Sequence, residues 1–105
     1  MYSSSKYLIS GATAETSGSV SVLGMDKFTV QMIGESNGVN QATGTMSVMG
    51  RLDSSAPYSK IFSNSFAGNS GVFVQFDGPM ESIMASLGAN PTGTFSAIIR
   101  YSSSK

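Results

Sequence analysis

Apolar and polar side chains alternate with a period of two in several short stretches of this chain. Phe28, Val30 and Met32 alternate with Lys, Thr and Gln, and residues 71–76 and 94–101 repeat the pattern. A period of two sends successive side chains to opposite faces of an extended strand, so one face can be buried while the other meets solvent. The pattern therefore predicts β-sheets with one buried face.

Gly, Pro, Asn and Ser residues separate these stretches at short intervals. Short strands divided by such turns are typical of an antiparallel sandwich or jelly roll. We therefore expect a single all-β domain over residues 1–105, an antiparallel, jelly-roll-like β-sandwich with seven or eight short strands. The expected strands cover residues 7–15, 19–23, 27–33, 43–52, 58–62, 71–76, 81–87 and 93–101.

Three local patterns refine this expectation. The connection at residues 24–26 suits a hairpin between the second and third strands, because its Gly and Asp tolerate positive φ. Residues 49–50 interrupt the alternation of the fourth strand and predict a bulge. Residues 79–87 leave an alternative open, since their apolar side chains would also share one face of a two-turn helix.

Charge is scarce and evenly balanced in this sequence. Six basic residues offset six acidic ones, and 11% of the residues are charged. The basic residues are scattered, whereas binding to phosphates needs clustered cations, so we expect no nucleic-acid partner. The apolar runs are too short to span a membrane, and the first residues lack the apolar segment of a secretory signal. We expect a protein made in a host cytoplasm, without export and without a membrane partner.

The sequence offers few groups for catalysis. It contains no His, Cys or Trp, so the usual general base near neutral pH and the usual metal ligands are missing. A Ser-x-x-Lys spacing, which could activate a serine, occurs only at residues 3–6 and 102–105. The carboxylates are dispersed and form no calcium-binding loop. We predict no catalytic residue, cofactor or metal site, and therefore a protein that is not an enzyme.

The sequence Tyr-Ser-Ser-Ser-Lys occurs near both ends of the chain, at residues 2–6 and 101–105. A tyrosine combines a large contact area with few rotatable bonds and a polar tip. One interpretation is that residues 1–6 and 101–105 are polar arms that contact neighbouring copies. The other is coincidence in a serine-rich chain with frayed ends.

Seven methionines are many for a chain of 105 residues. Methionine fills irregular gaps in cores and suits adaptable protein interfaces. Met32, Met46 and Met84 fall at strand positions predicted to face the core. The methionines nearest turns and strand edges join Lys6 and three tyrosines in the predicted interface, which consists of Tyr2, Lys6, Met25, Met49, Tyr58, Met80 and Tyr101.

The later strands carry a family resemblance. Residues 71–79 end in Gly-Pro, an Ile-x-Ala strand follows, and residues 93–100 begin with Gly-Thr. With the paired strand patterns at residues 28–32 and 44–51, the chain resembles the small β-sandwich capsid decoration, or cement, proteins of tailed bacteriophages. Tyr58 stands about where such chains often carry Trp.

The resemblance implies a role in the virion. A decoration protein binds the outer surface of a phage head at junctions between major capsid protein subunits, contacts neighbouring copies of itself, for instance in a trimer, and stabilises the shell. Many weak contacts, repeated over a shell, add up to firm attachment. The resemblance implies no catalytic residue.

Two other functions remain open at this point. A carbohydrate-binding sandwich would stack exposed aromatic rings on sugars. A different virion part, such as a trimeric head-spike or tail-fibre module, would also need a rigid sandwich. The rings available to a carbohydrate are Tyr2, Tyr58, Phe62, Phe66 and Phe73.

Overall fold

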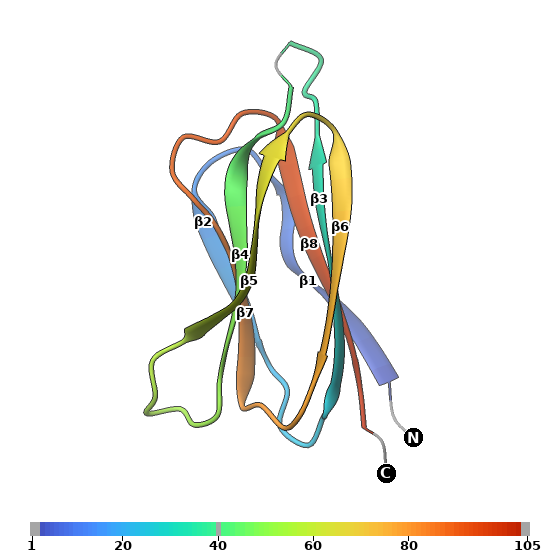
Figure 1. Ribbon diagram of the computed structural model, residues 1–105, viewed down its shortest axis with the longest axis vertical. Helices are drawn as coiled ribbons and strands as arrows, with labels where there is room; N and C mark the ends of the chain where they lie inside the picture. Colours follow the sequence, from blue (N-terminus) through green and yellow to red (C-terminus); the bar gives the residue numbers. More distant parts are fainter. Residues whose placement is uncertain (1–2, 40, 104–105) are drawn as a thin grey trace.

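The computed structural model describes residues 3–39 and 41–103, which form eight strands in two antiparallel four-stranded sheets (Figure 1). The first sheet has the strand order β1-β8-β3-β6 and the second sheet β2-β7-β4-β5. The predicted all-β sandwich is confirmed. The strands are β1 (Ser3–Ala12), β2 (Thr16–Ser21), β3 (Lys27–Glu35), β4 (Thr43–Arg51), β5 (Ser59–Ala67), β6 (Ser70–Asp77), β7 (Ser82–Leu87) and β8 (Thr94–Ser102).

The strand order is that of one long hairpin folded over itself. β4 pairs with β5, β3 with β6, β2 with β7 and β1 with β8, all antiparallel. β8 also pairs with β3, and β7 with β4, which joins these four pairs into two sheets. This is the eight-stranded arrangement of a jelly roll.

The hairpin expected at residues 24–26 is wrong. β2 belongs to the second sheet and β3 to the first, so the connection crosses from one sheet to the other. A short connection with permissive residues is compatible with both arrangements, because the local backbone does not decide which strand becomes the hydrogen-bonded neighbour. The expected bulge is confirmed, since the register of β4 against β5 shifts between Val48 and Met49.

Neither interpretation of the chain ends, polar arms or frayed termini, predicts the strand pairing that the structure shows for residues 3–6. Residues 3–6 are part of β1 and pair with residues 99–102 of β8, in register from Ser3 with Ser102 to Lys6 with Ile99. Strand pairing of this kind satisfies the backbone groups that a free arm would leave to water. Residues 1–2 and 104–105 lie outside the described residues.

The core lies between the sheets and is made by the inward positions of the alternating strands. Phe66 and Phe95 pack edge to face with ring centroids 5.2 Å apart. Gly34 provides the room, because a Cβ there would lie 2.7 Å from Cδ2 of Phe66. The most deeply buried large side chains are Phe95, Met32, Met46, Ile83, Leu87, Ile99, Val22, Val30 and Val48.

Met32 and Met46, two of the three methionines predicted to lie in the core, are fully buried there. Met84 is the exception, because it is half-buried on the outward face of β7, where it pairs with Met49 of β4. The helical alternative for residues 79–87 is also wrong, since Ser82–Leu87 is strand β7, paired on both sides.

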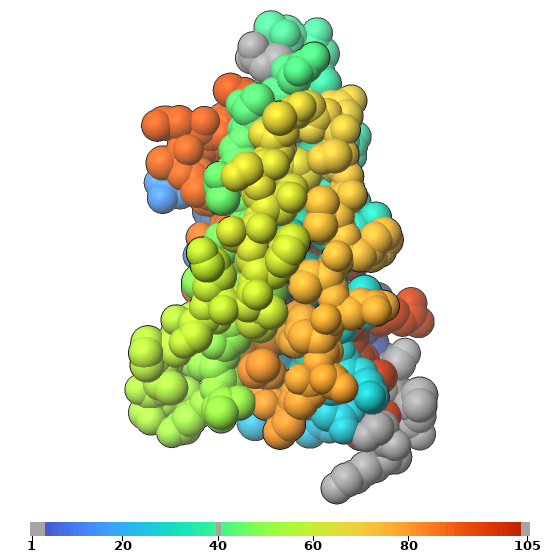
Figure 2. All heavy atoms as spheres, viewed as in Figure 1, coloured from blue at the N-terminus to red at the C-terminus, as the bar shows by residue number. Residues whose placement is uncertain are grey.

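One side of the sandwich is less well covered than the other. β5 and β6 are edge strands of different sheets and lie side by side across the front of the molecule in Figure 2. β6 contains no fully buried residue, and Val72, Val74 and Phe76 are only partly covered by the core. Phe76 stacks on Phe28, with ring centroids 5.1 Å apart.

Candidate binding surfaces

The outward face of the first sheet carries two neighbouring cross-strand rows of side chains. In the lower row, Gln75 pairs with Thr29, Thr29 with Arg100, and Arg100 with Ser5. In the upper row, Phe73 pairs with Gln31, Gln31 with Ile98, and Ile98 with Tyr7. Strands of a sheet lie about 4.8 Å apart, so each row spans about 14 Å from β6 to β1.

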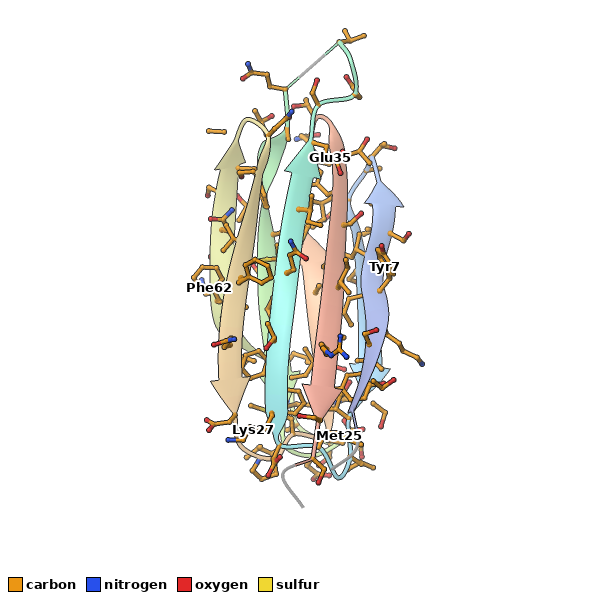
Figure 3. All side chains as sticks on the ribbon, turned by 90° about the vertical axis from the view of Figure 1, so that its right-hand side faces the viewer. Tyr7, Met25, Lys27, Glu35 and Phe62 are labelled. Carbon is orange, nitrogen blue, oxygen red and sulfur yellow. The ribbon has the colours of Figure 1, made fainter. Side chains whose placement is uncertain are left out.

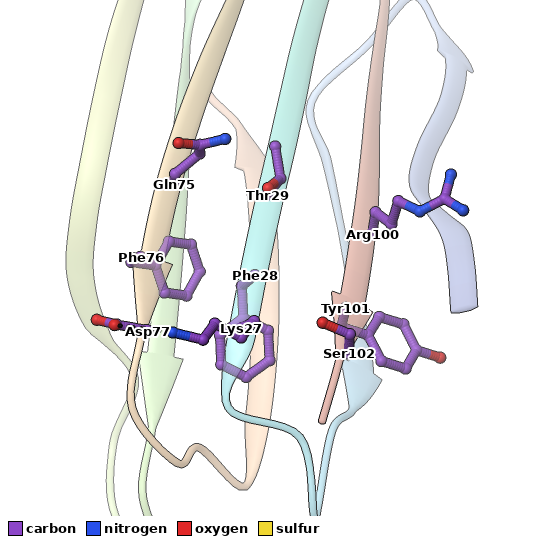
Figure 4. A pocket seen from close by; sticks show the side chains of 9 residues that line it. All are labelled: Lys27, Phe28, Thr29, Gln75, Phe76, Asp77, Arg100, Tyr101 and Ser102. Carbon is purple, nitrogen blue, oxygen red and sulfur yellow. Dashed lines mark ion pairs between the residues drawn. The ribbon is translucent and has the colours of Figure 1, made fainter. Parts of the chain in front are cut away.

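Two adjoining depressions lie along these rows. One depression of about 510 Å³ is bordered by β6, β3 and the end of β8, as the close view in Figure 4 shows. A second depression, of about 360 Å³, lies beside it and is lined in part by Ser5, Gln31 and Phe73. The two depressions share Thr29 and Arg100. We call the two together the outward groove.

The polar side chains in the middle of the outward groove have no partners among the residues that the structure describes. Among residues 3–39 and 41–103, the side chains of Thr29, Gln31, Gln75 and Arg100 form no hydrogen bond or ion pair with one another or with any other residue. Below them, Lys27 and Asp77 form an exposed ion pair with 3.6 Å between Nζ and Oδ2. The central polar groups are therefore free to bind a ligand.

Two aromatic rings stand at the ends of the upper row. Phe73 on β6 is 66% exposed and Tyr7 on β1 is 61% exposed. Figure 3 views this face directly and shows Tyr7 projecting from β1, with Lys27 and Glu35 at opposite ends of β3, which β8 separates from β1. Large exposed rings on a sheet face are a frequent mark of a binding surface.

Only one of these two rings is predicted as a binding residue from the sequence. The sequence indicates Phe73 as a ring available to a sugar, whereas it places Tyr7 only at the start of a strand. The register of β1 against β8 shifts between Tyr7 and Ile9, so Leu8 and Ile9 are both buried and Tyr7 faces outward. A bulge of this kind in Tyr-Leu-Ile has no local sequence signal, and only the pairing partner reveals it.

Three of the four remaining rings proposed for sugar binding are covered or have partners. Phe66 is buried in the core and Phe62 is partly buried against it. The Tyr58 hydroxyl lies 2.7 Å from the Ser82 hydroxyl, and the Arg51 guanidinium carbon lies 4.6 Å from the centre of the Tyr58 ring. Tyr2 is outside the described residues.

Tyr58 belongs to a cluster that ties the β4–β5 connection to β7. Arg51 Nε donates a hydrogen bond of 2.7 Å to Glu81 Oε1, which raises the pKa of the arginine. Ser82 Oγ in turn donates to the carbonyl of Val20 at 3.0 Å. In the same connection, a hydrogen bond from Ser55 lowers the pKa of Asp53. These contacts hold the β4–β5 connection in place, so we assign the cluster a structural role.

The other predicted interface residues are spread over the molecule. Lys6 is exposed on edge strand β1, and Met25 and Met80 are half-buried in connections at one end of the sandwich, packed against the core. Tyr101 is a correction: it is 8% exposed, since its position in β8 faces the core beside Phe28. Most of its ring is covered, and the part that remains exposed borders the first depression of the outward groove.

Met49 lies at the centre of the outward face of the second sheet. It pairs with Met84, which pairs on its other side with Ser19, and Ser47 pairs with Ser86 in the next row. Both methionines are half-buried; Met49 pairs on its other side with the exposed Lys60, and the neighbours in the next row are serines. An apolar centre with a polar surround is the usual anatomy of a protein contact.

The titratable groups form no metal-binding cluster in the described part of the chain. No group of three or more Asp or Glu side chains among residues 3–39 and 41–103 could hold a metal ion together. The same residues contain no helix that is long and apolar enough to cross a membrane. The predictions that the chain is no enzyme and has no metal or cofactor remain predictions.

Comparison with known proteins identifies similar folds but assigns the chain to no family. No family model and no curated protein matches this sequence. Among solved structures, the chain is similar to the SPBc2 prophage-derived protein YomS, with a TM-score of 0.74 and 14% identity, over 95% of this chain and 92% of that one. The resemblance to phage β-sandwich proteins is therefore supported at the level of fold, and a capsid decoration role is not assigned.

Two further likenesses are weaker. A subunit of the Bacillus endospore appendages, described as disulfide-linked pili, matches with a TM-score of 0.52 and 18% identity over 98% of this chain and 88% of that one. A family 29 carbohydrate-binding module matches with a TM-score of 0.52 and 10% identity over 94% and 91%. These identities are low, so the likenesses concern the fold alone. Because this chain has no cysteine, it cannot form the disulfide links of those pili.

Proposed function

We propose that this chain is a structural protein of a phage particle, bound as a decoration protein to the outer surface of the head and in contact with the major capsid protein. Its role is to stabilise the shell by adhesion, without catalysis. The observation that carries the proposal is the fold shared along nearly the whole chain with a prophage-derived protein. The rigid jelly roll, with no convergent set of reactive groups in its described part, agrees with an adhesive role.

The outward face of the second sheet is the surface best suited to the shell. The Met49–Met84 pair supplies an adaptable apolar centre, and the surrounding serines supply short hydrogen-bonding groups. A single contact of this size would be weak. Repetition at every equivalent position of a shell, together with contacts between neighbouring copies, would raise the overall strength of attachment.

The test is co-sedimentation of the purified protein with heads assembled from the major capsid protein encoded in the same genome. We expect saturable binding to heads and none to purified tails. The double substitution Met49→Ser and Met84→Ser should reduce occupancy at least tenfold, because it removes the apolar centre. Val39→Ser, at an exposed loop position, is the matched control and should bind as the wild type does. Failure of the wild-type protein to bind heads would refute the proposal.

Carbohydrate binding is a second candidate function, and a specific observation favours it. The outward groove, together with the Tyr7 ring at the end of its upper row, combines two exposed rings with unpaired amide, hydroxyl and guanidinium groups, on the fold that a family 29 carbohydrate-binding module also has. The groove and the Met49–Met84 face belong to different sheets, so one molecule could use both. A decoration protein would then present the groove away from the shell.

A further inference from the structure

We propose that the outward groove of the first sheet binds an oligosaccharide that carries a carboxylate group, with Arg100 as the residue that binds the carboxylate. This inference rests on the second candidate function and narrows its ligand to one chemical class. It is independent of attachment to a phage head, which involves the other sheet.

The size of the groove suits a short oligosaccharide better than a protein. Its two depressions, of about 510 and 360 Å³, fall in the range of roughly 300–1,000 Å³ typical of small-molecule sites. A stable protein contact usually buries about 800 Å² on each partner. Two rows of side chains that span about 14 Å provide much less area than that. A linear ligand lying across the strands would fill both rows.

The rings at the ends of the upper row provide flat apolar surfaces. Phe73 and Tyr7 are separated by Gln31 and Ile98, so a ligand that stacks on one ring passes over a polar and an apolar side chain before it reaches the other. A sugar ring presents C–H groups on its faces and hydroxyls around its edge. The negative face of an aromatic ring attracts such C–H groups, and the Tyr7 hydroxyl adds a hydrogen-bonding tip.

The central polar groups match the edge of a sugar. Each amide of Gln31 and Gln75 offers two N–H donors and one oxygen acceptor, and Thr29 offers a hydroxyl that can donate and accept. None of these groups forms a hydrogen bond within the described part of the protein. A sugar hydroxyl can likewise donate and accept, so it can satisfy either end of an amide. A purely apolar partner would leave these groups unpaired at a cost.

Charge complementarity selects a carboxylate. Arg100 is the single charged side chain in the two rows, and within the described residues it has no acidic partner. Figure 4 shows its side chain extending across the face toward β1. The nearby Lys27–Asp77 pair is neutral overall, so the groove carries an excess of positive charge. A guanidinium binds a carboxylate through two parallel hydrogen bonds, which fixes position and orientation together.

The test is isothermal titration of the full chain with oligogalacturonates of four to six residues and with neutral maltohexaose as the uncharged comparison. We expect the galacturonates to bind and the neutral oligosaccharide to bind at least tenfold more weakly. Raising the salt concentration should weaken galacturonate binding because the key contact is ionic. If galacturonates fail, an array of uronic- and sialic-acid oligosaccharides extends the search to other carboxylated sugars.

Substitutions locate the site. Arg100→Gln should reduce affinity for the carboxylated ligand at least tenfold and abolish its preference over the neutral one. Phe73→Ala should weaken binding of both ligands by several fold. Lys60→Gln is the matched control, because Lys60 is an exposed cation on the second sheet. Circular dichroism and melting temperature confirm that each variant is folded.

Three outcomes would overturn the inference. The first is that no carboxylated oligosaccharide on the array binds. The second is binding that Arg100→Gln leaves unchanged. The third is equal binding of neutral and carboxylated ligands, which would retain carbohydrate binding but refute the role of the carboxylate. Co-sedimentation of Arg100→Gln with heads should equal that of the wild type, so the two functions can fail separately.

Discussion

Some glycines of this fold lie where a side chain would have no room, and Gly18 of β2 has the least room of all. A Cβ built on Gly18 would lie 1.9 Å from the carbonyl oxygen of Leu8. The carbonyl belongs to β1 in the first sheet, so the absence of a side chain allows the two sheets to approach at this edge. The contact is with backbone and cannot be relieved by the rotation of a side chain.

Gly18→Ala should therefore destabilise the protein strongly, by about 3 kcal/mol or more, since β1 or β2 would have to move. Gly71→Ala is the matched control, because Gly71 is also a strand glycine but its nearest contact would be an ordinary 3.8 Å. The control should change stability by less than about 1 kcal/mol. Urea unfolding measures both, and equal effects of the two substitutions would contradict this interpretation of Gly18.

The residue scale also shows what sequence reasoning can recover about the candidate sites. Met49 was predicted at an interface and does lie on an outward face, and Phe73 was identified as an available ring. Tyr101 and Met84 were misplaced, because each was assigned a side of its strand without knowledge of the partner strand. In the sequence, Arg100 is only one of six scattered basic residues, because its lack of an acidic partner is visible only when its neighbours across the sheet are known.

At the scale of elements, the pairing of β1 with β8 determines how the two ends of the chain behave. Residues 3–6 pair with residues 99–102 and close one side of the first sheet. Tyr101, opposite Ser4, is buried partly by this pairing. Polar composition suggested free ends here, but the backbone groups of serine pair in a ladder as well as those of any other residue.

Deletion of residues 1–6 should therefore lower the free energy of unfolding by about 2 kcal/mol or more, because several ladder hydrogen bonds are lost and Tyr101 is uncovered. Deletion of residues 104–105 removes nothing from β8 and should have a much smaller effect. Thermal unfolding compares the two truncations. If both leave the melting temperature unchanged, residues 3–6 act as an arm in solution after all.

At the scale of the whole molecule, strands that are distant in sequence are neighbours in space. The first strand pairs with the last, and only β4 and β5 pair as consecutive strands. The molecule is elongated, measuring 46 × 28 × 17 Å, with the connections gathered at the two ends of the long axis (Figure 1). The chain must close long loops, and so lose conformational entropy, before most of these contacts can form.

We therefore expect slow folding, with relaxation times of about milliseconds to seconds in stopped-flow refolding monitored by tyrosine fluorescence. The Gly18→Ala and β1-deletion variants should both unfold faster than the wild type if the β1 side forms after the transition state. Folding on the microsecond scale would contradict the dominance of distant pairings.

The sequence by itself determined that the chain forms short strands with one buried face and that few reactive groups are available. The bounds of seven of the eight strands are predicted to within a few residues. These properties follow from side-chain period and composition, which are local. The tertiary structure alone decided which strands pair, which side of β1 and β7 faces outward, and that Tyr7, Phe73 and Arg100 lie on one sheet face. Each strand can form backbone hydrogen bonds with several other strands. Which strands pair therefore depends on the whole chain.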